Sequence, residues 1–172
     1  MSNKEAAAPS RKNQILKAAA ALFAEKGYYK TTTADVAREV GVTQPYVFHF
    51  FKTKEELYSA VLQEAKEIIV YAFASTEAPA ENLQASMGMA FESLLKSCRN
   101  EMLLIMTAFT IPEPAIREQV RAGFDEVYEH VKDQFTKAGI ADPEDEARDF
   151  IGCGLMITMA EILQLPKLFP WE

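Results

Sequence analysis

One short segment of the chain holds residue types that suit contact with a nucleic acid. The run "TQPYVFHFFKTK", residues 43–54, places an amide, four consecutive ring-bearing residues and two lysines within twelve positions. Amides hydrogen-bond to base edges, rings contact thymine methyls or the backbone, and lysines pair with phosphates. The same residues are also compatible with an ordinary apolar core or a ligand pocket. The elements that hold the segment decide between these interpretations.

The residues around this segment predict two short helices that cross steeply. Ala37 is small enough to let the helices approach, and Gly41 can take the left-handed conformation of a tight turn. Thr43 suits the N-cap of the second helix, and Pro45 fits its first turn, where a missing amide costs nothing.

The second helix divides the aromatic run between two faces. The inward face takes three apolar residues, Val47, Phe50 and Phe51. The outward face takes four residues beside two lysines: Gln44, Tyr46, Phe48 and His49, with Lys52 and Lys54. Packing does not explain exposed rings beside lysines, whereas docking into a major groove does, with Gln44 within reach of base edges.

The rest of the chain is predicted to be helical. Apolar residues recur at helical spacing from Ile15 to a stop at Gly27, and again from Leu57 to Ile69 behind a capping box at 53–56. Further helices are expected at about 80–98, 100–110, 113–138 and 143–164. No segment alternates with a period of two, so the expected fold class is all-α, with a three-helix head and a C-terminal helical bundle.

The charged residues are distributed unequally between the expected head and the expected body. Residues 1–58 hold nine Lys/Arg and six Asp/Glu, a sum of +3, and the remainder holds nine and nineteen, a sum of −10. A basic head on an acidic body suits a DNA partner for the head, although the net charge is −7. We expect a DNA-binding domain at 1–56 and a body at 57–172. No signal peptide, membrane span or paired cysteine spacing is evident, so a cytoplasmic protein with no membrane partner is expected.

Residues from about 11 to 62 resemble the DNA-binding domain of the TetR (tetracycline-repressor-like) family of bacterial transcription regulators. The matching features are "AAALFAEKGYYKTTTADVAREVGV", which holds the end of one helix and the first helix of a helix-turn-helix, and "TQPYVFHFFKTKEELYSAVL", which holds the recognition helix and the start of a connecting helix. The resemblance implies a homodimer on an operator in double-stranded DNA. It also implies an all-helical C-terminal domain that binds a small molecule, and repression that the ligand relieves.

The resemblance also assigns roles within the head. Gln44, Pro45 and Tyr46 match base-contacting positions, and Phe48, His49 and Lys54 match positions that usually touch phosphate. Thr32 or Thr33 matches the start of a helix whose first amides rest on a phosphate, and Thr43 caps the recognition helix. Two features depart from the family pattern: Phe48 lacks the hydroxyl that would bond a phosphate, and the sequence runs out in "LPKLFPWE" where another helix is usual.

Met-rich segments in the body suggest a pocket or an ordinary core. The candidate ligand-binding residues are Phe91, Met102, Met106, Thr107, Phe109, Phe124 and Tyr128. No basic residue is expected to face that interior, so an uncharged or cationic apolar ligand is favoured over a phosphorylated one. The small and apolar residues of 150–163, including "GCGLMITMA", suit either a four-helix dimer interface or an intramolecular core.

Nothing in the chain is typical of an enzyme. His49 and Cys153 have no partners at catalytic or metal-ligand spacing, and the acidic run at 142–149 is the ordinary first turn of a helix. We therefore expect no metal, no cofactor and no catalysis. Two alternatives remain: a helical enzyme or carrier, or a DNA-binding regulator that answers to a protein partner or to no ligand.

Overall fold

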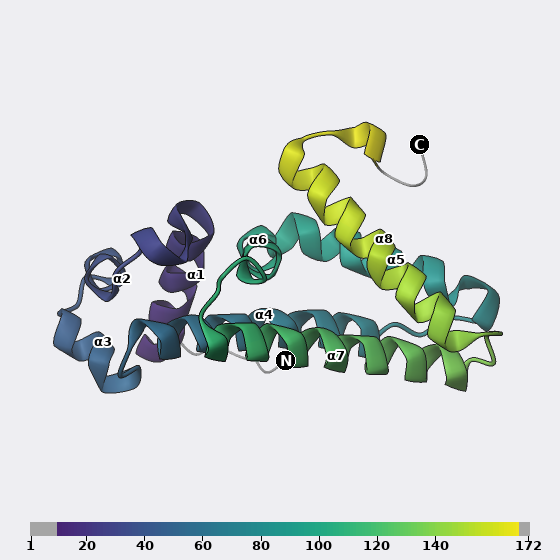
Figure 1. Cartoon of the computed structure of the whole chain (residues 1–172), viewed down its shortest axis with the longest axis horizontal. Helices are drawn as coiled ribbons and strands as arrows, with labels where there is room; N and C mark the ends of the chain where they lie inside the picture. Colours follow the sequence, from purple (N-terminus) through teal and green to yellow (C-terminus); the bar gives the residue numbers. More distant parts are fainter. Residues whose placement is uncertain (1–9, 169–172) are drawn as a thin grey trace, which may run out of the picture. The chain divides into compact units, whose positions relative to one another are not determined.

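The computed structural model describes residues 10–168, which form eight α-helices, one short 3-10 turn and no strand (Figure 1). The elements in order are α1 (Arg11–Lys30), α2 (Thr33–Val40), α3 (Gln44–Phe50), α4 (Lys54–Ala74), α5 (Ala80–Ser97), α6 (Arg99–Ala108), α7 (Pro114–Lys137), α8 (Pro143–Leu163) and η1 (Pro166–Leu168). The all-α prediction is confirmed. The four body helices lie within two residues of their predicted ends. None of the helices in this described part is long and apolar enough to cross a membrane.

The chain divides into two compact units, one ending at Val61 and the other beginning at Leu62. The first unit, called the head below, contains α1, α2, α3 and the first residues of α4. The second unit, called the body, contains the remainder of α4 and all later helices. The helix α4 therefore contributes residues to both units.

Three aromatic rings form the centre of the head. The ring of Tyr58, on α4, meets the rings of Phe23 and Tyr28, on α1, edge to face, with both centroid distances at 4.9 Å. All three side chains are buried. Edge-to-face pairs of this kind add about 0.5–1.5 kcal/mol each to the stabilisation from burial. This packing holds α1 and the start of α4 together.

The link from α1 to α2 depends on Gly27 and Thr31. Gly27 has φ 78°, a conformation that is natural for glycine, and it interrupts the helical backbone where the stop was predicted. The fully buried hydroxyl of Thr31 lies 3.1 Å from the carbonyl oxygen of Leu22 and 2.9 Å from that of Gly27. A buried polar group needs such partners, so this hydroxyl stabilises the turn.

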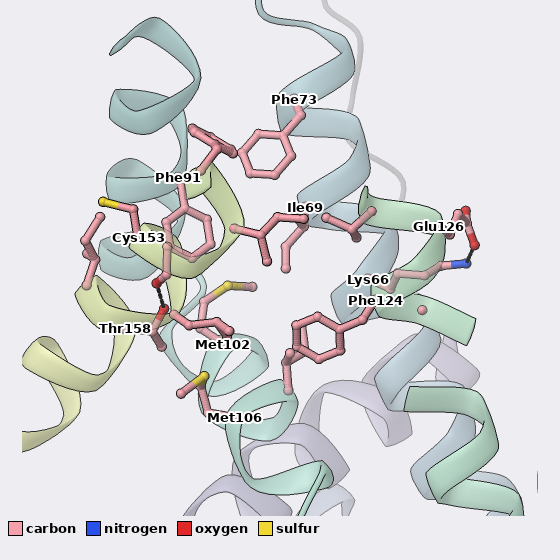
Figure 2. A pocket seen from close by; sticks show the side chains of 18 of the residues that line it. Lys66, Ile69, Phe73, Phe91, Met102, Met106, Phe124, Glu126, Cys153 and Thr158 are labelled. Carbon is pink, nitrogen blue, oxygen red and sulfur yellow. Dashed lines mark hydrogen bonds and ion pairs between the residues drawn. The ribbon is translucent and has the colours of Figure 1, made fainter. Parts of the chain in front are cut away.

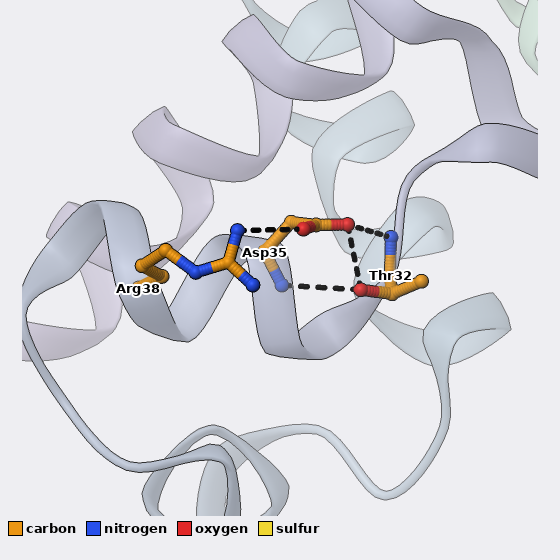
Figure 3. Close-up of polar contacts among 3 residues, drawn as sticks. All are labelled: Thr32, Asp35 and Arg38. Atoms are coloured by element: carbon orange, nitrogen blue, oxygen red, sulfur yellow. Dashed lines mark hydrogen bonds and ion pairs between the residues drawn. The ribbon is translucent and has the colours of Figure 1, made fainter.

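The helix α2 begins with a capping box (Figure 3). The Thr32 hydroxyl accepts from the Asp35 amide at 3.1 Å, and the Asp35 carboxylate accepts from the Thr32 amide at 3.0 Å. The Thr32 hydroxyl also donates to the Asp35 carboxylate at 2.6 Å. This bond, followed by the one from the Thr32 amide and the charge of Arg38, lowers the pKa of Asp35. Gly41 ends the helix in the left-handed conformation, with φ 71°, as expected. Ala37 and Val36 are buried against the rest of the head.

The predicted capping box of α4 is confirmed in one half and wrong in the other. The Glu56 amide donates to the Thr53 hydroxyl at 3.0 Å, as expected. The Glu56 carboxylate, however, accepts from the amide of Lys52 at 2.7 Å and not from that of Thr53. The chain turns sharply after α3, and the turn brings the Lys52 amide within reach of that carboxylate.

The body packs its helices around one apolar core. Buried residues from every helix of the body contribute to it, among them Phe73, Met87, Met102, Phe135 and Phe150. Within this unit α4 and α7 run side by side (Figure 1), and Gln134 on α7 donates its amide to the carbonyl of Phe73 at 3.2 Å. The Met-rich segments are therefore core at these positions, one of the two interpretations that the sequence allowed.

Replacing the buried hydroxyl that closes α1 should destabilise the protein. Thr31→Val leaves two backbone carbonyls without their partner, so we expect the free energy of unfolding to fall by about 1–3 kcal/mol in urea titration. The control is Thr136→Val, which removes a hydroxyl bonded to the Lys132 carbonyl on the exposed face of α7 and should change stability by less than about 0.5 kcal/mol. Equal losses in the two variants would contradict the assignment.

Candidate DNA-binding face and ligand cavity

The helix α3 presents the predicted outward residues on an exposed face. Tyr46 and Phe48 are 40% and 37% exposed, large fractions for aromatic side chains, whereas Val47 is fully buried. Phe51 is buried, as predicted. Phe50 was predicted to lie in the core with them, but it is only half-buried. The reason is that its ring supports the outer row: it meets the rings of Tyr46 at 5.4 Å and His49 at 5.2 Å, both edge to face.

The N-terminus of α3 is tied to α2 through side chains. The amide nitrogen of Gln44 donates to the hydroxyl of Thr33 at 2.8 Å, and Thr33 is buried. The backbone of Thr43 has the extended conformation of an N-cap, but its side chain makes no capping hydrogen bond. Pro45 lies in the first turn, as predicted. The Thr33 contact orients the carboxamide of Gln44.

The threonines at the start of α2 have different environments. Thr33 is buried and holds Gln44, whereas Thr32 lies at the surface and is engaged by Asp35. Asp35 also brings a negative charge to this helix N-terminus. The amides of Thr32 and Asp35 are already bonded within the chain, which leaves fewer donors for a phosphate there than the resemblance implied.

The two lysines after α3 lie differently. The ammonium of Lys54 donates to the carbonyl of Tyr28 at 3.0 Å and lies 4.3 Å from the centroid of the Tyr28 ring, so it is engaged inside the head. Lys52 is exposed, and its ammonium is 3.4 Å from the Phe48 carbonyl, a long hydrogen bond. The cation most available to a phosphate beside α3 is therefore Lys52, which was noted in the sequence but not included among the candidate DNA-binding residues.

The body contains a cavity of about 670 Å³ lined from α4, α5, α6, α7 and α8 (Figure 2). Four of the seven residues predicted to bind a ligand lie in its wall: Phe91, Met102, Met106 and Phe124. Their rings and thioethers face a common apolar space. A cavity of this volume is in the range that holds small-molecule ligands.

The structure does not bring the other three candidates to the cavity wall. The hydroxyl of Thr107 lies 3.0 Å from the Leu103 carbonyl within α6. Phe109 is exposed, and its ring centroid lies 6.3 Å from that of Phe124. Tyr128 packs on the core, and its hydroxyl is 3.4 Å from the Glu144 carbonyl. Residues Phe73, Ile69 and Cys153 line the cavity although the sequence had not singled them out for it.

The expectation that no basic residue would face this interior was wrong. Lys66, on α4, lines the cavity and forms an ion pair with Glu126, on α7, at 2.5 Å (Figure 2). Its side chain is only 18% exposed, because its hydrocarbon stem lies along α7 beside Gly123. The Cδ of Lys66 is 3.6 Å from the point where the Cβ of a larger residue at position 123 would lie. A signal was present: Lys66 directly follows the buried Ala65 and precedes Ile69 by three residues, at the edge of the apolar stripe.

The wall formed by α8 has a different character. Burial raises the pKa of the Cys153 thiol, which disfavours the nucleophilic thiolate. Thr158 is buried, and its hydroxyl donates to the Gly154 carbonyl at 2.8 Å. This wall therefore offers no charge to a ligand.

The opposite side of α8 carries an uncovered apolar stripe. Its members recur at helical spacing and are exposed: Gly152, Met156, Met159 and Leu163. Phe150 and Ile157 are buried in the core of the body instead. The helix thus has both a core face and an apolar outer face. The sequence had allowed either use.

Comparison with known proteins agrees with this description. Residues 15–61 match the family model described as bacterial regulatory proteins, tetR family. The transcriptional repressor KstR2 of Mycobacterium tuberculosis is 33% identical over 89 residues, 49% of this chain and 44% of that protein. The transcriptional activator FasR of Mycolicibacterium smegmatis is 26% identical over 131 residues, 74% of this chain and 59% of that protein. The chain thus spans about half the length of these curated relatives.

Solved structures share the fold over most of the chain. The fatty acid degradation regulator FadR of Bacillus halodurans has a TM-score of 0.77 at 14% identity, with 91% of this chain and 86% of that chain covered. AibR, solved with isovaleryl coenzyme A and operator DNA, has a TM-score of 0.69 at 20% identity, with 94% and 99% covered. These relatives and neighbours are named as regulators, not as enzymes. The head thus matches the family model of the tetR bacterial regulatory proteins over residues 15–61, and the chain shares its fold with solved TetR-like regulators.

Proposed function

We propose that the protein is a cytoplasmic, homodimeric repressor that binds operator DNA through α3 and leaves it when a small, largely apolar molecule enters the cavity of the body. The observation that carries the proposal is the outward face of α3. It exposes Tyr46 and Phe48 while the residues between and after them, Val47 and Phe51, are buried. A catalytic protein has no use for an exposed row of rings beside Lys52.

The chemistry of this face fits the major groove. Gln44 lies at the start of α3, where the first residues of a recognition helix reach base edges. One hydrogen of its amide nitrogen is given to Thr33, which leaves the second hydrogen and the oxygen for a base edge such as that of adenine. Tyr46 and Phe48 offer ring edges to thymine methyls and to the sugar–phosphate backbone. The +3 charge of residues 1–58 against −10 in the rest directs an anionic duplex to the head.

A ligand that acts on the body is supported by the cavity. Its lining is mostly apolar with few polar groups, which is the usual character of small-molecule sites. AibR was solved with both a small molecule and operator DNA, a precedent for the two partners in one protein of this fold. A regulator that answers to a protein partner or to no ligand is the alternative, and it would leave a cavity of about 670 Å³ without a use.

The helix α4 can transmit the state of the body to the head. It has 21 residues and is about 30 Å long at 1.5 Å per residue. A small displacement of its body end changes where its head end lies, and DNA binding requires two heads at one fixed separation. The ligand can then reduce DNA affinity only by its differential affinity for the two arrangements, typically 1–3 kcal/mol.

Substitutions on α3 should separate sequence preference from general affinity. Gln44→Ala should cost roughly 1–3 kcal/mol and relax base preference at one position of each half-site. Lys52→Ala should weaken binding to all sequences alike and flatten the dependence of affinity on salt. DNA fragments selected from a genomic pool by the purified protein, followed by salt-dependent mobility shifts, provide the measurement. The division of roles is contradicted if both variants lose affinity uniformly.

A charge in the α8 stripe should abolish the dimer. Met159→Glu places a carboxylate where an apolar face would be buried by the second copy, so the variant should sediment as a monomer at micromolar concentration while the wild type sediments as a dimer. The control is Tyr71→Glu, at an even more exposed aromatic site on α4, and this variant should remain dimeric. A wild-type monomer under these conditions would refute the homodimer.

A further inference from the structure

We propose that the cavity takes an amphiphilic monocarboxylate, and that the carboxylate of this ligand replaces Glu126 as the partner of Lys66. The proposal rests on the function proposed above and names the class of ligand for the same cavity. It depends on the distribution of charge around an apolar space, shown in Figure 2.

Lys66 is the single Lys or Arg among the described residues of the cavity wall. Its side chain is 18% exposed, and its ammonium is paired with the carboxylate of Glu126. This pairing does not depend on which carboxylate supplies the charge. A ligand anion that reaches the same place serves equally well.

The present partner is easily exchanged. The side chain of Glu126 is 54% exposed, so its carboxylate regains water when it leaves the ion pair. Ion pairs with such an exposed partner are worth little in net terms. The other acidic residue of the wall, Glu92, is already paired with Lys96 at 2.6 Å. Replacing Glu126 therefore costs little and leaves no unpaired charge inside the cavity.

The remainder of the cavity specifies an apolar body with a single charged end. Phe91, Met102, Met106 and Phe124 supply rings and thioethers to the space between the walls. Figure 2 shows Thr158 on the other side of this group from Lys66, and its hydroxyl is uncharged and bonded to the Gly154 carbonyl. A second carboxylate would find no cation there. The matching ligand is a monocarboxylate with a hydrocarbon-like body.

The exchange also links binding to the movement of α4. The Lys66–Glu126 pair joins α4 to α7, and a second link, from Gln134 to the Phe73 carbonyl, lies nearly two turns further along α4. A carboxylate that takes Lys66 breaks the first link and leaves the second. An uncharged molecule that fills the same apolar space leaves both intact. The charge of the ligand, and not its volume alone, then decides whether the Lys66–Glu126 link between α4 and α7 is broken.

Calorimetric titration of the full chain with two matched probes, decanoate and decanamide, tests the proposal. The wild type should bind decanoate about tenfold tighter or more, because a charge-assisted hydrogen bond to Lys66 is available only to the anion. Lys66→Met keeps the apolar stem and removes the charge, so the preference should disappear while decanamide affinity persists. Retained decanamide binding also reports that this variant is folded.

Variants of the competing carboxylate give effects of opposite sign. Glu126→Gln removes the competitor and should tighten decanoate binding several-fold without changing decanamide. The control is Glu118→Gln on the same helix, which breaks an exposed ion pair with Arg121 outside the cavity and should change neither affinity. A ligand that instead needs Glu126, such as a cation, would make Glu126→Gln weaken binding.

Three outcomes would overturn the proposal. Equal affinities for the two probes, or weaker decanoate binding by Glu126→Gln, would exclude the exchange while leaving a ligand-binding body in place. Binding of neither probe would exclude this class of ligand altogether. Failure of the proposed function is recognised separately, because the unliganded protein would then retain no DNA fragment from a genomic pool in a mobility-shift assay.

Discussion

A seven-residue helix cannot hold its own conformation in water, and every property that we propose for α3 depends on the packing that compensates for this. Val47 and Phe51 are buried in the head, and the ring of Phe50 contacts those of Tyr46 and His49. In the same unit, the ring of Tyr58 contacts those of Phe23 and Tyr28. Because Tyr58 belongs to α4, the same contact that stabilises the head also joins it to the helix that continues into the body.

The ion pairs of the structure have unequal importance. Most join neighbours three or four residues apart on exposed helix faces, such as Glu118 with Arg121, and contribute little to stability. Lys66 and Glu126 are different, because they are sixty residues apart in sequence and join two helices at the wall of a cavity. An interaction that is weak in net free energy and is placed between two helices suits a switch, since little energy is needed to change its partner.

Much of the fold could be predicted from the sequence because its signals are local. Prolines and glycines mark the helix ends, and Gly27 and Gly41 adopt the positive φ values that their positions required. The exposed face of α3 was predictable for the same reason, since 3.6-residue periodicity separates Val47 from Tyr46 and Phe48 without any knowledge of distant residues. The capping box of Thr32 and Asp35 follows the same kind of local pattern and was overlooked.

The contacts that were not predicted join residues far apart in sequence. The engagement of Lys54 by Tyr28, and that of Lys66 by Glu126, depend on how helices are placed in three dimensions. A long, flexible side chain reaches either solvent or an interior from the same backbone position, so periodicity alone does not decide its environment. Thr107 and Tyr128 likewise share helices with cavity residues, and Phe109 directly follows α6, yet none of the three lies in the cavity wall.

The hydrogen bond from Gln44 to Thr33 has a consequence for how the protein can change over generations. The side chain that is suited to read a base is oriented by a residue on another helix, so the two positions form one functional unit. A new side chain at position 44 would lie beside a threonine hydroxyl placed to accept from glutamine. A new side chain at position 33 would remove the hydrogen bond that orients Gln44. Divergence toward a different operator is therefore easiest through paired substitutions in α2 and α3, and each single step passes through an intermediate that discriminates poorly.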